Sequence, residues 1–326
     1  MYETSTKSVI MKYPPFDVNY IGEKHPLISH LLAIATAQLT ELPDFSEDKK
    51  VAVFSDFGGE HKGAGFNTYS FLIIAYDKIT PFIEATEQLR RKHGILEPFS
   101  EFSYKDLNYG PRQRALNEFL HITETLLHGA LITLVVDKKI ETLFGTDRKS
   151  ISESVKQEFS RLDLGNWKFE TAEKALRICH AIAFFASLTT HSNQRLLWYC
   201  DNDPVNENTN FFNDTKKILN YTAVFYLKHS FEILGFAKSF EGKSHLDDLL
   251  SISDFAAGVI QDLMTGHYSK DGQITEKKVP LVKWLTQRSK FLTKITIEMR
   301  KLPNGDIGSG VVQFETPKST DGPNAR

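Results

Sequence analysis

The stretch VAVFSDFGGEHKGAGFNTYSFLIIAY, residues 51–76, decides the fold. Its apolar run at residues 51–54 and its β-rich run at residues 69–76 flank a glycine-rich segment, a pattern typical of two strands of a hairpin. Asp56 stands at the end of the first strand. A carboxylate in such a place costs free energy unless a cation lies beside it. The function of Asp56 therefore depends on where the other acidic residues lie.

Length and composition are those of a globular protein. The chain has 326 residues, of which 41% are hydrophobic and 25% charged, enough apolar material for a large core. No window approaches the roughly eighteen apolar residues of a membrane span, and residues 1–20 lack the apolar core of a signal peptide. The two cysteines, Cys179 and Cys200, indicate a reducing compartment and exclude a disulfide framework. We expect a cytoplasmic protein without a membrane segment.

The net charge of −2 provides no general basic field, so a nucleic-acid ligand would need a local patch. Three segments are basic: Arg90–Lys92, Lys138-Lys139 and the run 283–301. We favour solvated faces for all three. Trp284 and Phe291 in the last run could stack bases, but we favour a place for both in the core.

Strands and helices alternate along the rest of the chain. We expect a helix ending near Leu39, a helix over 81–92 capped by Gly94, a third strand over 101–107, a helix over 111–128 closed by Gly129, and a strand over 130–137. Further strands are expected over 195–203, 230–238 and 310–315, with helices over 218–226 and 246–264 and a helix followed by a strand over 281–301. This order predicts an α/β fold. We expect an arm and helix over 1–45, one domain over 46–315 with a helical insertion over about 145–195, and a disordered tail over 316–326.

Acidic residues interrupt this apolar structure at several points, namely Asp56, Glu101, Asp137, Asp201, Asp203 and Asp254. Asp254 lies within an otherwise apolar predicted helix. Its neighbours on the same helix face are Ala257, Gly258 and Gln261. The small residues there either leave space for a ligand or allow close packing of the helix on a sheet.

These motifs resemble the DUF3800 family of the ribonuclease H-like superfamily. SDFGGE is similar to the family's first strand and turn, EFSYKDL to its Glu with a nearby Lys, WYCDND to its later Asp, and SISDFAAGVIQ, which follows the KSH of residues 243–245, to its closing helix. The similarity covers most of residues 50–265. It implies a mixed central sheet flanked by helices.

The resemblance also implies a metal-dependent nuclease acting on RNA or DNA. Asp56, Glu101, Asp254 and either Asp201 or Asp203 would hold Mg²⁺ or Mn²⁺, since hard cations prefer oxygen ligands. Asp56 would bridge two ions, and Lys105 would neutralise charge that develops on the phosphate. Glu97 stays open as an alternative to Glu101.

Other functions remain open at this point. The turn after Asp56 is Phe57-Gly58-Gly59-Glu60, where the family has Glu-Ser-Gly. The alternative is therefore a catalytically inactive module on the same fold that binds nucleic acid or a protein. A phosphoesterase for small nucleotides is a third candidate, and a protein partner or a homo-oligomer stays open. No P-loop, G-x-S-x-G or H-E-x-x-H motif occurs.

Overall fold

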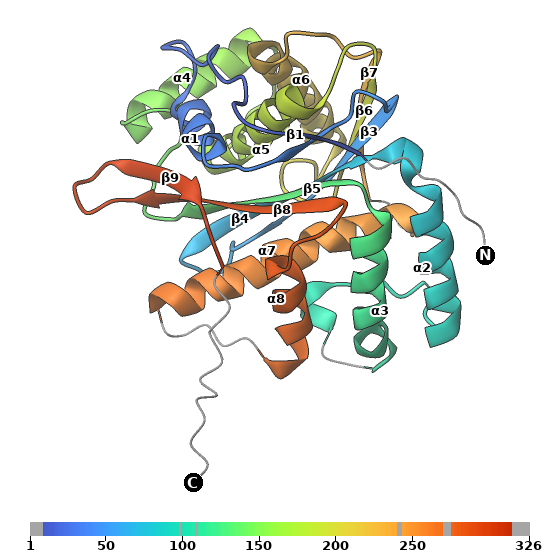
Figure 1. The fold of residues 1–326 in the computed structure, drawn as a ribbon. Helices are drawn as coiled ribbons and strands as arrows, with labels where there is room; N and C mark the ends of the chain where they lie inside the picture. Colours follow the sequence, from blue (N-terminus) through green and yellow to red (C-terminus); the bar gives the residue numbers. More distant parts are fainter. Residues whose placement is uncertain (1–8, 98, 108–109, 240–242, 270–274, 315–326) are drawn as a thin grey trace.

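A seven-stranded mixed sheet lies at the centre of the molecule (Figure 1). The computed structural model describes residues 9–314 except 98, 108–109, 240–242 and 270–274. The strands of this sheet are, in chain order, β3 (Lys50–Gly58), β4 (Phe66–Ala75), β5 (Gly129–Asp137), β6 (Arg195–Cys200), β7 (Ile233–Lys238), β8 (Leu292–Lys301) and β9 (Ile307–Val311). Their order in space is β7-β6-β3-β4-β5-β8-β9. β3 and β4 pair antiparallel, which confirms the predicted hairpin.

The strand directions bring several carboxyl ends to one edge of the sheet. β3, β5, β6, β7 and β8 run the same way, and β4 and β9 run against them. Since β5 and β6 run in the same direction, the chain between them must cross over the sheet, as parallel strands require. The predicted α/β fold with a mixed central sheet is confirmed by these strands.

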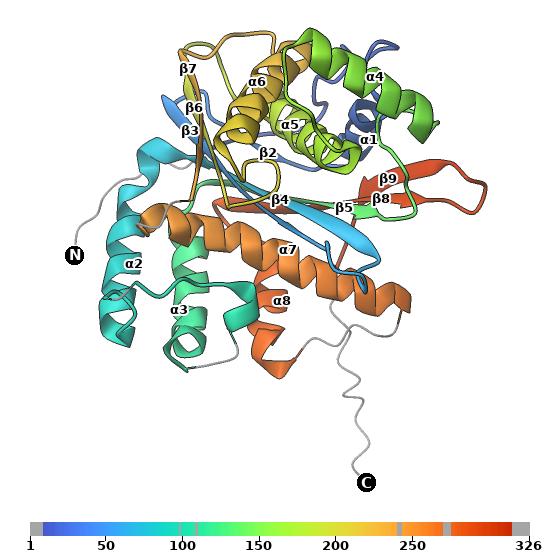
Figure 2. The ribbon, with the colours of Figure 1, turned by 180° about the vertical axis from the view of Figure 1, so that it is seen from behind.

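Helices cover both faces of the sheet (Figure 2). One face carries α1 (Leu27–Thr36), α5 (Phe169–Thr189) and α6 (Thr209–Tyr226), with α4 (Arg148–Arg161) packed on α5. The other face carries α2 (Thr80–His93), α3 (Gly110–Leu126), α7 (His245–Ser269) and α8 (Val279–Thr286). Side chains of a strand alternate between faces. Val51 and Val53 accordingly join the core under α5, and Ala52 and Phe54 join the core under α7. We refer to these as the α5 face and the α7 face.

The segment expected to be a helical insertion forms α4 and α5, and α5 is the crossover helix between β5 and β6. In contrast, residues 76–128 separate two antiparallel neighbours, β4 and β5, that a short turn could join. They contribute α2 and α3 to the α7 face. Near the amino terminus, β1 (Ile10–Lys12) and β2 (Leu42–Asp44) form a small antiparallel sheet that the sequence did not indicate. The predicted tail over 316–326 lies outside the described residues.

The strand predicted over Glu101–Leu107 is wrong. Residues 101–103 are irregular and Tyr104–Asp106 form a 3₁₀ turn. The alternation that suggested a strand arises because Phe102 and Tyr104 point into a helical layer. The ring of Phe102 stacks on Phe119 of α3, with 4.6 Å between centroids.

Gly129 was predicted to close the preceding helix, and this is also wrong, because it is the first residue of β5. Its N–H donates to the carbonyl of Phe291 at 2.8 Å. A Cβ at this position would lie 2.0 Å from the Ile73 carbonyl oxygen of β4. Glycine is thus required by the close approach of two strands.

None of the helices in the described part of the chain is long and apolar enough to cross a membrane.

Candidate functional site

The register of β3 and β6 places Asp56 beside Asp201. The two strands are parallel, with Ser55 opposite Cys200, so the next position of each strand carries an aspartate. The N–H of Asp201 continues the ladder by donating to the Ser55 carbonyl at 3.4 Å. Because Phe54 faces α7, Asp56 two residues later faces α7 as well.

Helix α7 brings Asp254 to the same point. The hydroxyl of Ser253 donates to the Phe54 carbonyl at 2.9 Å, which fixes the helix against β3. The carboxyl groups of Asp254 and Asp56 lie within hydrogen-bonding reach of each other. The backbone N–H of Tyr104 donates to Asp254 Oδ2 at 2.6 Å and holds this carboxyl group in place.

Burial and like charge disfavour ionisation of these acids. Burial raises the pKa of Asp56 well above its usual range, and the charges of Asp254 and Asp201 raise it further. Burial raises the pKa of Asp254 to about 6, and Asp201 contributes. The pKa of Asp201 is also raised, mainly by burial, with a contribution from Glu101. Carboxylates brought so close require a shared proton or a cation. We call Asp56, Asp201 and Asp254, with the neighbouring Glu101, the acid group.

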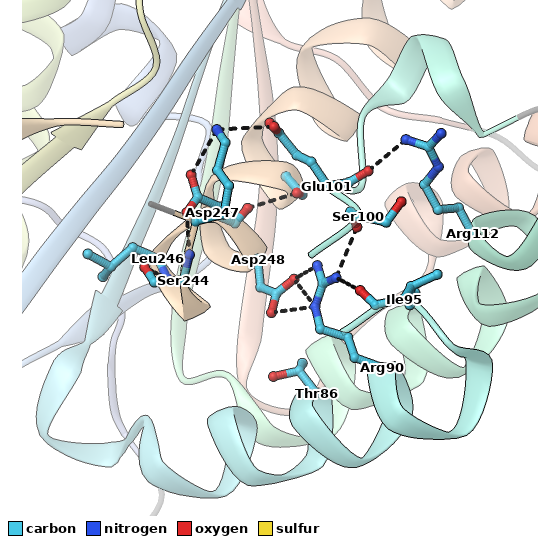
Figure 3. A network of polar contacts seen from close by, with 12 residues as sticks. Thr86, Arg90, Ile95, Ser100, Glu101, Arg112, Ser244, Leu246, Asp247 and Asp248 are labelled. Carbon is cyan, nitrogen blue, oxygen red and sulfur yellow. Dashed lines mark hydrogen bonds and ion pairs between the residues drawn. The ribbon is translucent and has the colours of Figure 1, made fainter. Parts of the chain in front are cut away.

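Glu101 enters the acid group through Lys243. Its Oε2 lies 3.1 Å from Lys243 Nζ, which lies 3.4 Å from Asp247 Oδ1 in the first turn of α7. Lys243 also donates to the hydroxyl of Ser239 at 3.0 Å. Figure 3 shows Glu101 and Asp247 on two sides of this network. The cation at the acid group is therefore Lys243, which the sequence indicated only as part of the KSH motif. The side chain of Lys105 is exposed, and so is that of the alternative Glu97.

Arg90 anchors the loop that presents Glu101 (Figure 3). Its side chain is 1% exposed and forms a fork with the Asp248 carboxylate on α7. Its Nη1 donates to the carbonyls of Ile95 at 3.0 Å and Ser100 at 2.9 Å. This single guanidinium ties the loop after α2 to the first turn of α7. The basic character of Arg90–Lys92 thus serves packing and local ion pairs.

Asp203 lies apart from the acid group. Its carboxylate pairs with Lys174 of α5, which also binds Glu60. Lys174 Nζ lies 5.0 Å from the ring centroid of Phe57, the strand residue after Asp56, and so belongs to the α5 face. Of the two aspartates left open by the sequence, the structure brings Asp201 to Asp56 and pairs Asp203 with a lysine.

Space beside Asp254 is filled by protein. A Cβ at Gly258 would lie 2.2 Å from an atom of the Tyr104 ring. Of the two alternatives that the sequence left open for this residue, the structure therefore has close packing. The hydroxyl of Tyr104 then donates to Asp262 one turn further along α7.

The acid group has the donor chemistry of a hard-cation site, but its ligands do not yet converge. All its donors are carboxylate oxygens, which suit Mg²⁺ or Mn²⁺. Within the described ranges, no three or more His, Cys, Asp or Glu side chains are already arranged around one point as metal ligands. Asp56 and Asp254 are in contact, and Asp201 or Glu101 would have to move toward them to complete a site.

The two aromatics of the run 283–301, which were considered as an alternative for base stacking, do not share a helix face. Trp284 is 4% exposed, and α8 ends at Thr286, so Phe291 does not share a helix face with it. Phe291 instead stacks on His128, with 4.4 Å between ring centroids. The favoured place in the core is therefore confirmed for Trp284, whereas Phe291 is half-buried.

No protein-family model matches the chain, and a comparison with curated proteins finds no match. Among solved structures, the chain is similar to the ribonuclease H2 from Pyrococcus horikoshii OT3, with 14% identity over 72% of this chain and 85% of that chain and a TM-score of 0.34. A likeness at this level carries no argument about function. The resemblance to the DUF3800 family stays a prediction.

Proposed function

We propose that this protein is a metal-dependent nuclease, a DUF3800-like member of the ribonuclease H-like superfamily that hydrolyses phosphodiester bonds in RNA or DNA. The observation that supports it most is the contact between Asp56 and Asp254 beside Asp201. A fold gains no stability from three half-buried carboxyl groups placed together, so their grouping favours a functional role.

Each residue of the acid group, and Lys243, would have a separate role. Asp56 and Asp254 would hold Mg²⁺ or Mn²⁺, with Asp201 and Glu101 completing the ligands or orienting water. When bound, such ions activate water and stabilise the leaving oxygen. Lys243, 3.1 Å from Glu101, takes the part first expected of Lys105 and would neutralise charge on the scissile phosphate.

Cleavage assays test this proposal. Labelled RNA and DNA are incubated with Mg²⁺, Mn²⁺ or EDTA, using wild type, Asp56→Asn and Asp254→Asn. Asp48→Asn is the matched control, because Asp48 is a buried aspartate at the opposite end of β3, 2.8 Å from Lys78. Cleavage that needs metal and survives only in wild type and Asp48→Asn supports the proposal. Cleavage by Asp56→Asn at the wild-type rate contradicts it.

The second candidate is an inactive module that binds nucleic acid on the same fold. It is favoured by the unassembled ligands and by Lys243, which already neutralises Glu101. This candidate predicts binding of RNA or DNA without cleavage under any metal. Calorimetry without any heat of Mg²⁺ or Mn²⁺ binding would favour it over the nuclease.

A further inference from the structure

Four exposed lysines stand at the same end of the sheet as the acid group. They lie in the segment between β3 and β4, directly after β5, and at the end of β8, and they are Lys62, Lys138, Lys139 and Lys301. Two of them belong to the basic Lys138-Lys139 segment, which the acid group leaves without a role.

Strand pairing places these lysines side by side. β5 and β8 are parallel with Val136 opposite Met299, so Lys138 falls opposite Lys301 two positions later. Lys138 also holds the segment between β3 and β4. Its backbone N–H donates to the Gly65 carbonyl and its Nζ to the His61 carbonyl, both at 3.0 Å. With strands about 4.8 Å apart, β5 and β8 lie roughly 10 and 15 Å from β3, which carries Asp56.

Nearby carboxylates offset part of this positive charge, and exposed Glu141 lines a pocket together with Lys138. Glu60 is engaged by Lys174 on the α5 face. Asp137 is buried, and its oxygens accept the backbone N–H groups of Lys139 at 2.9 Å and Lys301 at 3.4 Å. Among the described residues, Lys62, Lys139 and Lys301 take part in no ion pair. Since the whole chain carries a net charge of −2, this is a local concentration of charge.

We infer that the phosphodiester backbone of a nucleic acid lies across the ends of β4, β5 and β8 and contacts these four lysines. We call the row of these four lysines the lysine track. The inference rests on the proposed function, because the acid group would cut the nucleic acid at one end of this track. A row of positive charges leading to an acidic centre suits a ligand with regularly repeated anions. The acidic centre alone would repel such a ligand in the absence of metal.

Binding is measured apart from cleavage, by fluorescence anisotropy of labelled 20-nucleotide RNA and DNA in EDTA, over a series of salt concentrations. The track variant carries Lys62→Gln, Lys138→Gln, Lys139→Gln and Lys301→Gln. The matched control removes four exposed positive charges at the opposite end of the sheet, through Lys49→Gln, Lys50→Gln, Arg288→Gln and Lys290→Gln.

Each phosphate contact contributes about 0.7–0.9 to the slope of log affinity against log salt. We expect the track variant, which loses four such contacts, to lose roughly 2.8–3.6 of this slope and at least about tenfold in affinity at low salt. The control should bind within about twofold of wild type. The RNA and DNA arms show which polymer binds more tightly.

The inference is overturned if wild type binds neither polymer, if the track variant binds as wild type does, or if the control weakens binding as much as the track variant. The nuclease proposal fails separately. Track-dependent binding without cleavage in Mg²⁺ or Mn²⁺ contradicts the nuclease and leaves the lysine track standing. Metal-dependent cleavage by wild type, together with normal binding by the track variant, contradicts the lysine track and leaves the nuclease proposal standing.

Discussion

Charged side chains are arranged differently on the two faces of the sheet, at the same end of the strands. On the α5 face, Asp203 is paired with Lys174. The strand positions next to Asp56 and Asp201 that face α5 hold Phe57 and Cys200. On the α7 face, one residue away along each strand, Asp56 and Asp201 stand beside a third aspartate of α7. Paired charges stabilise a fold or are neutral to it, whereas grouped like charges destabilise it. This contrast is the reason for proposing that the function lies on the α7 face.

The largest effect should come from Asp56→Asn. Hydrolysis should fall at least about a thousandfold, since a group at the reacting centre is removed. The thermal midpoint in EDTA should stay or rise at pH 7, because the substitution relieves a buried like-charge contact. A variant that loses its fold together with its activity would contradict this separation of function from stability.

Arg90→Met should cause the largest loss of stability. It leaves the Asp248 carboxylate buried without its partner, at a cost of about 3–5 kcal/mol in the free energy of unfolding by urea. Arg91→Met on the same helix is the control. Its pair with Glu87 is exposed, so we expect a loss far smaller than that of Arg90→Met. Equal losses in the two variants would contradict the anchoring role of Arg90.

His180 should make stability fall in acid. It is buried on the α5 face, its Nδ1 lies 2.6 Å from the Tyr226 hydroxyl, and burial lowers its pKa from 6.5 to about 3. Below pH 6.5 the unfolded chain binds a proton that the folded chain refuses. The contribution of neutral His180 to the free energy of unfolding is fully present above about pH 6.5. It declines by about 1.4 kcal/mol per pH unit below that pH. The urea midpoint of His180→Gln should depend less on pH between 6.5 and 5, and an unchanged dependence would contradict this assignment.

Lys174→Met should give the smallest effect. It leaves Asp203 half-buried without a counter-ion and should cost about 1 kcal/mol in urea unfolding. Cleavage by the folded variant should match wild type, because this pair lies outside the acid group. A tenfold loss of cleavage would show that the α5 face takes part in the chemistry.

Local patterns in the sequence predicted much of this arrangement. The hairpin, β5 and α7 follow from runs of apolar residues whose period is preserved in the structure. Asp56, Asp201 and Asp254 were proposed together because the motifs that contain them resemble those of one family. The structure brings them together through the register of β3 with β6 and the packing of α7 on β3. The sequence did not decide between Asp201 and Asp203, since that depends on the register of β3 with β6.

The failures share a cause, which is that the partners are distant in sequence. Residues 101–107 alternate like a strand, but their apolar side chains pack against helices. The pairing of Glu101 with Lys243, from the segment before α7, could not be predicted from the residues next to Glu101. Gly258 suggested ligand space only because Tyr104, which fills it, lies far away in the chain.

Calorimetric titration with Mn²⁺ tests the central claim most directly, in wild type, Asp56→Asn and Asp48→Asn. The account predicts saturable binding to wild type and Asp48→Asn and at least about tenfold weaker binding to Asp56→Asn. Absence of binding to wild type, or equal binding to all three proteins, would contradict the claim that the acid group holds a cation.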